Sequence, residues 1–313
     1  MGQRMAHSRP SIVSASYRTD IPAFYAAWFR ARLQAGFARV VNPYGGPPSR
    51  VSLVPPDCLG FVFWTRNAAP FLPVLDDVRR TGLPFLVQFT VTGYPRPLDA
   101  ATIRPAEAIA QIREIAARHG SGHVVWRYDP IVFSTLTEPA HHRDGFARLA
   151  DGLQGSVDEV IVSVAQIYRK TARNLDNAAR RHGFSWRDPA SGERERVVAD
   201  LATLAAERGI RLSLCGQPEL LRPGVAEARC IDADRLSRLA GRPLPAAAKA
   251  HRQRCACYAS RDIGGYDSCP HGCAYCYAVS GRDAAKRRFA AHDPTAECLV
   301  PPNAASRGDE ATG

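Results

Sequence analysis

The run Phe85-Leu-Val-Gln-Phe-Thr-Val91 decides the fold, because it is short, almost continuously apolar and rich in residues that favour strands. A run of this kind predicts a strand buried on both faces, as in a parallel sheet covered by helices. The next segment supports this interpretation, since Ile109, Ile112 and Ile115 recur at helical spacing. A strand followed by a helix is the repeating unit of an α/β fold.

The same alternation runs along most of the chain. It predicts six strands: Ile12–Ser16, Gly60–Trp64, Phe85–Val91, His123–Tyr128, Glu159–Val164 and Ile210–Cys215. Six strand–helix units predict a partial (β/α)6 TIM-like barrel, with a complete barrel or a doubly wound sheet as alternatives. A β-hairpin at 39–53 is expected outside the main sheet, and 232–241 predicts one more capped helix.

We divide the chain into three parts on this basis. Residues 11–245 form the predicted barrel, and residues 246–280 form a cysteine-rich segment expected to pack on the barrel mouth. Residues 281–313 are basic at first, then small and polar, which predicts a frayed tail.

Composition narrows the class of protein. The chain has 313 residues, of which 45% are hydrophobic, enough to bury a full core. The net charge of +11 is compatible with an anionic small-molecule or nucleic-acid substrate, and equally with a bias toward arginine codons. Nine cysteines, five of them within 255–276, argue against a secreted disulfide framework. With no apolar leader or membrane-length apolar run, we expect a cytoplasmic protein and no membrane contact.

Near the C-terminal end, Cys269, Cys273 and Cys276 form a C-x-x-x-C-x-x-C motif. Three thiolates at this spacing can bind three irons of a [4Fe-4S] cluster, whereas a conventional electron-transfer cluster takes four cysteines. Cys255 and Cys257 lie just upstream and leave alternatives open. They could bind a second cluster, protect the first, or contribute to a four-thiolate zinc site, although their C-x-C spacing differs from that of a zinc ribbon.

Several segments together resemble the bacterial domain-of-unknown-function family numbered 1848. They are Ser14–Pro22, Phe63–Asn67, Gln88–Tyr94, Trp126–Pro130 and Cys255–Ala278. The resemblance implies no settled activity, only that the C-terminal cysteines are similar to the radical S-adenosylmethionine (SAM) signature. The loop 273–278 alone is also similar to that of spore photoproduct lyases, a DNA-repair branch of that superfamily.

The radical-SAM resemblance implies a [4Fe-4S] cluster whose open iron binds SAM, and an electron donor such as flavodoxin or ferredoxin. The reduced cluster would cleave SAM to a 5'-deoxyadenosyl radical that acts on an unknown substrate. Tyr275, Gln88 and Thr90 are the expected cofactor contacts. Radical-SAM enzymes carry the cysteine loop after their first strand, so the resemblance implies that the order of elements here is circularly permuted. The segment before Cys269 would then act as the first strand, beside Ile12–Ser16.

Polar side chains follow the predicted strands at the points where they end. Arg18 and Asp20 follow the first strand, Arg66 the second, and Arg127 and Asp129 end the fourth. Because the carboxyl ends of parallel strands meet at one edge, we expect these five side chains to form a shared catalytic pocket. The alternative is a set of ion pairs that closes the rim.

A second hypothesis is a nucleic-acid-binding protein whose cysteines form a structural zinc knuckle. It rests on the net charge and on residues 168–196, where arginines alternate with Tyr168, Phe184 and Trp186. The same stretch also fits a solvated helix and loop. Cys215 is expected to be a buried strand residue, and His271 a loop residue rather than a metal ligand.

Overall fold

The computed structural model describes residues 10–42, 46–249 and 255–301. Within these residues one sheet of eight strands forms the centre of the molecule, and every strand pair in it is parallel. In spatial order the strands are β12 (Ser260–Asp262), β1 (Ser11–Ala15), β4 (Cys58–Thr65), β5 (Phe85–Thr90), β6 (Val124–Ile131), β8 (Glu159–Val164), β10 (Arg211–Leu214) and β11 (Ala226–Glu227).

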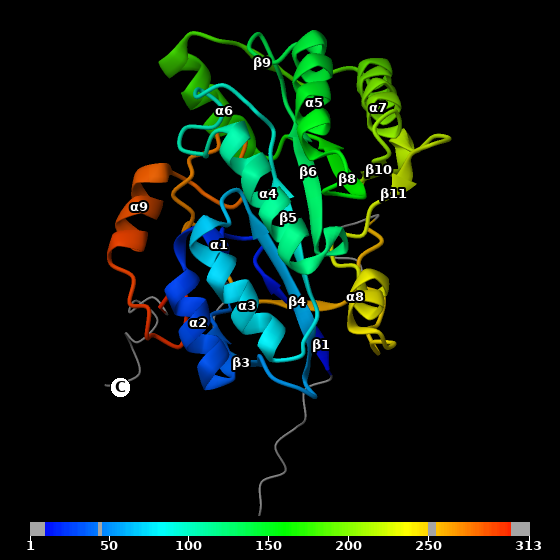
Figure 1. Cartoon of the computed structure of the whole chain (residues 1–313). Coiled ribbons are helices and arrows are strands. Elements are labelled where there is room, and N and C mark those ends of the chain that lie inside the picture. Colours follow the sequence, from blue (N-terminus) through cyan, green and yellow to red (C-terminus); the bar gives the residue numbers. More distant parts are fainter. Residues whose placement is uncertain (1–9, 43–45, 250–254, 302–313) are drawn as a thin grey trace, which may run out of the picture.

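Helices cover one face of this sheet (Figure 1). Successive residues of each strand point to opposite faces, so the strands contribute to two apolar layers, one on each face. Phe61 and Phe63 point toward the helices, whereas Val62 belongs to the layer on the opposite face. The covering helices are α2 (Ala26–Ala35), α3 (Leu72–Arg80), α4 (Pro105–His119), α5 (Pro139–Leu153) and α7 (Ser191–Ala206). Burial on both faces explains why the strand sequences are nearly continuous apolar runs.

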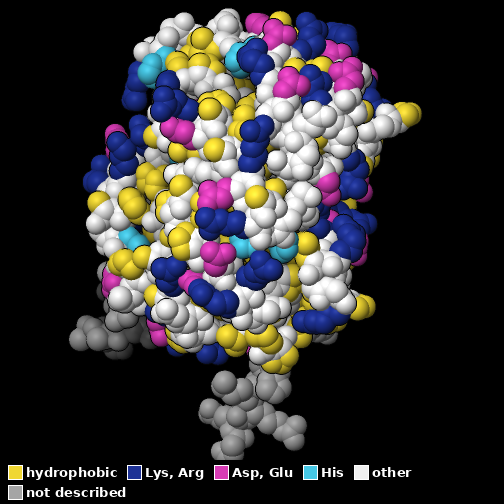
Figure 2. All heavy atoms as spheres, viewed as in Figure 1, with side chains coloured by type: hydrophobic (Ala, Val, Ile, Leu, Met, Phe, Trp, Pro, Cys, Tyr) yellow, Lys and Arg dark blue, Asp and Glu magenta, His cyan; other side chains and the backbone are white. Residues whose placement is uncertain are grey.

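The remaining elements are short or peripheral. They are α1 (Ile21–Phe24), β2 (Phe37–Val40), β3 (Ser49–Ser52), β7 (Phe133–Ser134), α6 (Arg169–His182), β9 (Trp186–Arg187), α8 (Ala233–Ala240), α9 (Arg282–Ala290) and three 3-10 turns at 69–71, 121–123 and 218–220. None of the described helices is long and apolar enough to cross a membrane. On the face shown in Figure 2, basic and acidic side chains are interspersed rather than gathered into one basic patch.

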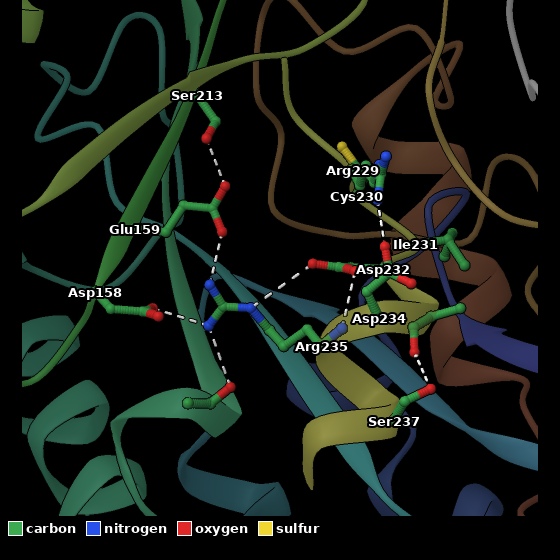
Figure 3. A network of polar contacts seen from close by, with 12 residues as sticks. Asp158, Glu159, Ser213, Arg229, Cys230, Ile231, Asp232, Asp234, Arg235 and Ser237 are labelled. Carbon is green, nitrogen blue, oxygen red and sulfur yellow. Dashed lines mark hydrogen bonds and ion pairs between the residues drawn. The ribbon is translucent and has the colours of Figure 1, made fainter. Parts of the chain in front are cut away.

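Helix α8 closes the opposite face at the amino ends of the strands. Its Arg235 is almost fully buried and donates to Asp158 Oδ1 at 2.8 Å and to Glu159 Oε2 at 2.7 Å (Figure 3). The same guanidinium donates to the carbonyl of Gly122 at 3.3 Å. Because Glu159 begins β8, this network fixes α8 against the amino edge of the sheet. A charge buried here is tolerated only because it is paired.

The sequence predictions hold for the class of fold and for its strands. All six predicted strands are present, and the hairpin of β2 and β3 is antiparallel and outside the main sheet, as expected. Two further strands, β11 and β12, extend the two ends of the sheet. The pairing of β12 with β1 agrees with the expectation that the segment before Cys269 lies beside Ile12–Ser16. Among the described residues no strand pair joins β11 to β12, so the barrel stays a prediction.

The expectation of a frayed tail from residue 281 is wrong for the part that the structure describes. Residues 282–290 form the helix α9 (Figure 1). Its Phe289 ring packs against the rings of Phe24 and Tyr25. Beyond it, Trp28 donates its indole N–H to the carbonyl of Ala296 at 2.8 Å. Side-chain contacts with α1 and α2 therefore order a segment whose own sequence carries little apolar pattern. Residues 302–313 lie outside the described residues.

Arg235→Leu should lower the free energy of unfolding by about 3–5 kcal/mol, because it leaves Glu159 buried without its main partner. Arg211 also contacts Glu159, at 3.0 Å, but its side chain is 56% exposed. Arg211→Ala should therefore cost less than about 1 kcal/mol. Urea unfolding of both variants measures the difference, and equal losses would contradict the assigned role of Arg235.

His142 should make stability depend on pH. The ring is fully buried, its Nδ1 lies 2.9 Å from the Tyr128 hydroxyl, and its Nε2 lies 3.1 Å from the carbonyl of Val132. Burial lowers its pKa from 6.5 to about 4. Below pH 6.5 the His142 ring binds a proton in the unfolded chain but stays neutral in the folded chain. The free energy of unfolding therefore falls as the pH drops from 6.5 toward 4.

This loss should amount to about 3 kcal/mol for one histidine. His142→Gln should be less stable at pH 7 yet show a shallower decline across this window, as measured by urea unfolding at several pH values. The exposed His182→Gln serves as the control and should keep the wild-type slope. A His142→Gln slope equal to that of wild type would rule the explanation out.

Candidate functional site

A cavity of about 780 Å³ opens at the carboxyl edge of the sheet. Its walls come from the carboxyl ends of β1, β4, β5, β6, β8, β10 and β11 with the segments that follow them, and from residues on both sides of β12. Its volume falls in the range of cavities that enclose a cofactor and a small substrate. Seven cysteines contribute to the lining: Cys215, Cys230, Cys255, Cys257, Cys269, Cys273 and Cys276.

The loop 269–276 is shaped by local hydrogen bonds and by one glycine. Gly272 has φ of +75°, a left-handed conformation that other residues adopt at a cost. The N–H of Cys276 donates to the carbonyl of Cys273 at 3.1 Å, which closes a tight turn. The loop is anchored to the segment after β5, because the N–H of Ala274 donates to the carbonyl of Leu98 at 2.8 Å.

The environment of the three loop thiols fits a bound metal cluster. Backbone N–H groups of Asp20 and His271 point at the sulfur of Cys269, and the N–H of Ala278 donates to Cys276 Sγ at 3.3 Å. Burial raises the pKa of all three thiols, partly offset at Cys273 by the charge of Arg66. Buried thiols of this kind become thiolates when a metal supplies positive charge, and N–H donors to sulfur tune such centres.

The three loop thiols are also separate from one another. Across the described part of the chain, no hydrogen bond joins the sulfurs of Cys269, Cys273 and Cys276 to each other, although all three face the same cavity. Within those same residues, no group of three or more His, Cys, Asp or Glu side chains is already arranged around one metal ion. A single small ion therefore does not fit the loop as it stands, whereas a larger inorganic cluster needs its ligands spread apart.

Arg18 lies on the cavity wall beside Asp262, a residue that the sequence analysis missed. Its Nε is 3.8 Å from Asp262 Oδ1, is buried, and has no hydrogen-bond partner. Asp262 instead accepts from the hydroxyls of Ser14 at 2.9 Å and Ser16 at 2.8 Å and from the N–H of Tyr17 at 3.0 Å. The guanidinium of Arg18 thus keeps donor capacity for an anionic group in the cavity.

Asp20 is a structural hub rather than a free acid. Its Oδ1 accepts from the N–H of Ala23 at 2.9 Å and caps α1. Its Oδ2 accepts from the N–H of Arg66 at 2.7 Å and contacts His271 Nε2 at 2.8 Å. Asp20 therefore ties the ends of β1 and β4 to the cysteine loop, and the structure places His271 in that tie rather than in an unattached loop.

Arg66 belongs to a second polar group with Asp99 and Tyr275. Its Nη1 donates to Asp99 Oδ2 at 2.9 Å, and its Nη2 donates to the Tyr275 hydroxyl. That hydroxyl in turn donates to Asp99 Oδ1 at 2.6 Å, and Thr92 donates to Oδ2 at 2.9 Å. The aromatic side chain of the cysteine loop is thus locked beside the third cysteine by a buried carboxylate.

Arg127 also lines the cavity and is almost fully buried. It pairs with Asp129, donates to Gln88 Oε1 at 3.3 Å and to Cys230 Sγ at 3.1 Å, and its guanidinium carbon lies 4.9 Å from the Trp64 ring centre. Asp129 also accepts from Ser163. The pair Arg127–Asp129 faces the cavity but is partly committed to neighbours, as the rim alternative predicts.

All the predicted site residues except Gln88 line the same cavity. The cavity lining includes Arg18, Asp20, Arg66, Thr90, Arg127, Asp129, Tyr275 and the five cysteines predicted as metal ligands. Gln88 does not line it, because this fully buried side chain donates to the carbonyl of Cys230 at 2.9 Å and braces Arg127. The chemical roles of these residues stay predictions.

Asp99, Asp262 and Cys230 escaped the sequence analysis. Asp99 lies nine residues beyond the last residue of β5, in a proline-rich loop, and Asp262 ends a strand too short to show a pattern. Cys230 has no cysteine within fourteen residues on either side, so no spacing signal marks it.

The basic stretch 168–196 forms α6, β9 and the start of α7. Phe184 is buried, and the indole of Trp186 donates to Asp176 Oδ1 at 2.9 Å, which leaves Tyr168 as the exposed aromatic residue of the three. Phe184 and Trp186 are therefore engaged within the fold. The stretch 168–196 thus does not offer a row of exposed aromatic side chains on which successive nucleic-acid bases could stack.

The fold and the cavity define an α/β protein with a cysteine-rich site at the carboxyl edge of a parallel sheet. Residues 12–278 match the family model described as Domain of unknown function (DUF1848), and the chain belongs to that family, as the sequence resemblance predicted. A search of curated proteins finds no match.

Gly272→Ala should destabilise the protein by about 1–2 kcal/mol through its left-handed backbone. An added Cβ would also lie 2.4 Å from Cδ of Arg282. Gly281→Ala is the matched control, because φ there is −168° and no atom lies within 4 Å of the added Cβ. Urea unfolding should show a clear loss for Gly272→Ala and almost none for Gly281→Ala; indistinguishable midpoints would contradict the assigned strain.

Proposed function

We propose that this chain is an iron–sulfur enzyme of the radical-SAM type, with Cys269, Cys273 and Cys276 as ligands of a [4Fe-4S] cluster. One observation carries the proposal. The three thiols of a C-x-x-x-C-x-x-C loop open into the same large cavity as Arg18 and Arg127, at the carboxyl edge of a parallel sheet. That edge is where α/β enzymes of barrel type assemble their active sites.

The order of the strands supports the radical-SAM interpretation. The cysteine loop follows β12, which lies at the end of the sheet and pairs with β1 in parallel. In this proposal β12 takes the place of the first strand of a partial (β/α) barrel, and the loop occupies the position after that strand. The chain would then be a circular permutation in which the first strand and its cluster loop come last.

When bound and reduced, such a cluster supplies the electron that cleaves SAM to methionine and a 5'-deoxyadenosyl radical. The protein contributes orientation and exclusion of water. Asp20 holds the loop against β1 and β4, and Asp99 holds Tyr275 beside the third cysteine. These contacts fix the three ligands relative to the cavity wall.

The substrate class proposed here is anionic or strongly polar. Arg18 lines the cavity with an Nε that makes no hydrogen bond, although it lies 3.8 Å from Asp262 Oδ1, and Arg127 places a buried guanidinium in the same lining. Low local dielectric strengthens the attraction of both groups for a carboxylate or phosphate. One of them could receive the carboxylate of SAM and the other the substrate.

An acidic electron donor such as flavodoxin or ferredoxin fits the surface around the loop. Asn174 of α6 donates to the carbonyl of Val279 at 2.9 Å, and Arg282 at the start of α9 donates to the carbonyl of Pro270 at 3.1 Å. Both flanking helices are rich in arginine and lysine. Positive charge around the loop would steer an acidic partner toward it.

Anaerobic reconstitution should load about four irons on the cysteine loop. Replacing Cys269, Cys273 and Cys276 together by alanine should abolish this iron, whereas Cys298→Ala, outside the cavity lining, should leave it unchanged. With dithionite and SAM the reconstituted wild type should release 5'-deoxyadenosine. Iron loading that survives in the triple variant, or loaded protein that never cleaves SAM, would refute the proposed function.

A further inference from the structure

We infer that Cys215, Cys230, Cys255 and Cys257 form a second metal site, which binds one tetrahedral divalent ion of the zinc type through four thiolates. The site is distinct from the cysteine loop and does not depend on the proposed radical-SAM function. Cys215 and Cys230 belong to it on structural evidence alone, because they lie far from the cysteine-rich segment in sequence.

The four thiols come from two separate parts of the fold. Cys215 follows β10 and Cys230 follows β11, at one end of the sheet. Cys255 and Cys257 precede β12, at the other end. The two parts meet in a backbone contact, where the N–H of Tyr258 donates to the carbonyl of Ile231 at 3.1 Å.

Contacts between the sulfurs are direct. The sulfurs of Cys215 and Cys230 are 3.3 Å apart, Cys230 and Cys257 share a hydrogen bond, and so do Cys257 and Cys255. Four ligands at about 2.3 Å from a tetrahedral zinc ion lie roughly 3.8 Å from one another. The separation of Cys215 and Cys230 is therefore close to what one ion requires, and the other two pairs are hydrogen-bonded, unlike the three loop thiols.

The four sulfurs lie in a row rather than around one point. Rotation of the outer thiols, Cys215 and Cys255, about their Cα–Cβ bonds is the change that would bring all four around an ion. Both outer residues are only half-buried and border the cavity, so this rotation has room. The two central residues, Cys230 and Cys257, are buried and set the position of the site.

The surroundings are those of a thiolate site. Arg127 Nη1 donates to Cys230 Sγ at 3.1 Å, and the N–H of Ile231 lies 3.5 Å from Cys257 Sγ. Four thiolates and a divalent ion carry a net charge of −2, which the buried Arg127 partly offsets.

An ion here would have a structural consequence. Among the described residues no strand pair joins β11 to β12, so the sheet keeps two ends. A four-thiolate ion would link those ends covalently across the interior, on the wall of the cavity. Because such a site does not exist in the unfolded chain, binding of the ion would stabilise the folded state.

The test uses the full chain with Cys269, Cys273 and Cys276 replaced by alanine, so that the loop cannot bind metal. Produced with zinc in the medium, this variant should contain about one zinc per chain and almost no iron or acid-labile sulfide. Adding Cys230→Ser or Cys257→Ser should reduce the zinc content at least about fivefold, whereas adding Cys298→Ser should not change it. Cobalt in place of zinc should give the visible bands of tetrahedral thiolate coordination.

A second measurement covers the case in which these variants do not fold. X-ray absorption at the zinc edge of wild-type protein should show a shell of four sulfurs at about 2.3 Å. Any of four results would overturn the inference. They are four irons with sulfide in the triple variant, a Cys215–Cys230 disulfide in the intact protein, nitrogen or oxygen ligands to the zinc, and zinc retained after Cys230→Ser. Failure of SAM cleavage would contradict the proposed function but not the zinc site, so the two proposals can be tested separately.

Discussion

The parallel direction of all strands is the constraint on which the rest of the structure depends. It collects eight carboxyl ends at one edge and eight amino ends at the other, and both faces between them must be covered. Helices cover one face, and α8 with the segments beside it covers the other. At the amino edge Arg235 seals the structure with buried ion pairs, which leaves the carboxyl edge as the place where a cavity can open.

Charges at that cavity divide into two kinds. The carboxylates of Asp20, Asp99 and Asp262 are saturated with hydrogen bonds from neighbouring segments, so they hold the walls together. The guanidiniums of Arg18 and Arg127 are held at the wall with some donor capacity left. A buried carboxylate costs less when it accepts several hydrogen bonds, as these three do, whereas Asp129 faces the cavity as the partner of Arg127.

The seven cysteines of the cavity also form two physically different groups. The loop thiols Cys269 and Cys276 accept hydrogen bonds from backbone N–H groups, and no hydrogen bond joins the three loop sulfurs of the described chain, an arrangement suited to a cluster with several metal atoms. The thiols of Cys215, Cys230, Cys257 and Cys255 contact one another in that order, and Cys230 also accepts a hydrogen bond from Arg127. Sulfur separation, rather than the number of cysteines, therefore distinguishes the two proposed centres.

Local patterns in the sequence determined the six main strands, their helices and the cysteine loop, because each depends on residues only a few positions apart. The family followed from short segments that include the same strand ends. Only the tertiary structure decided that Cys215 and Cys230 lie beside Cys255 and Cys257, that Gln88 braces Arg127 instead of lining the cavity, and that α9 is ordered. Those outcomes depend on which strands become neighbours and on side chains that pack against residues from other elements, and no local spacing encodes either one.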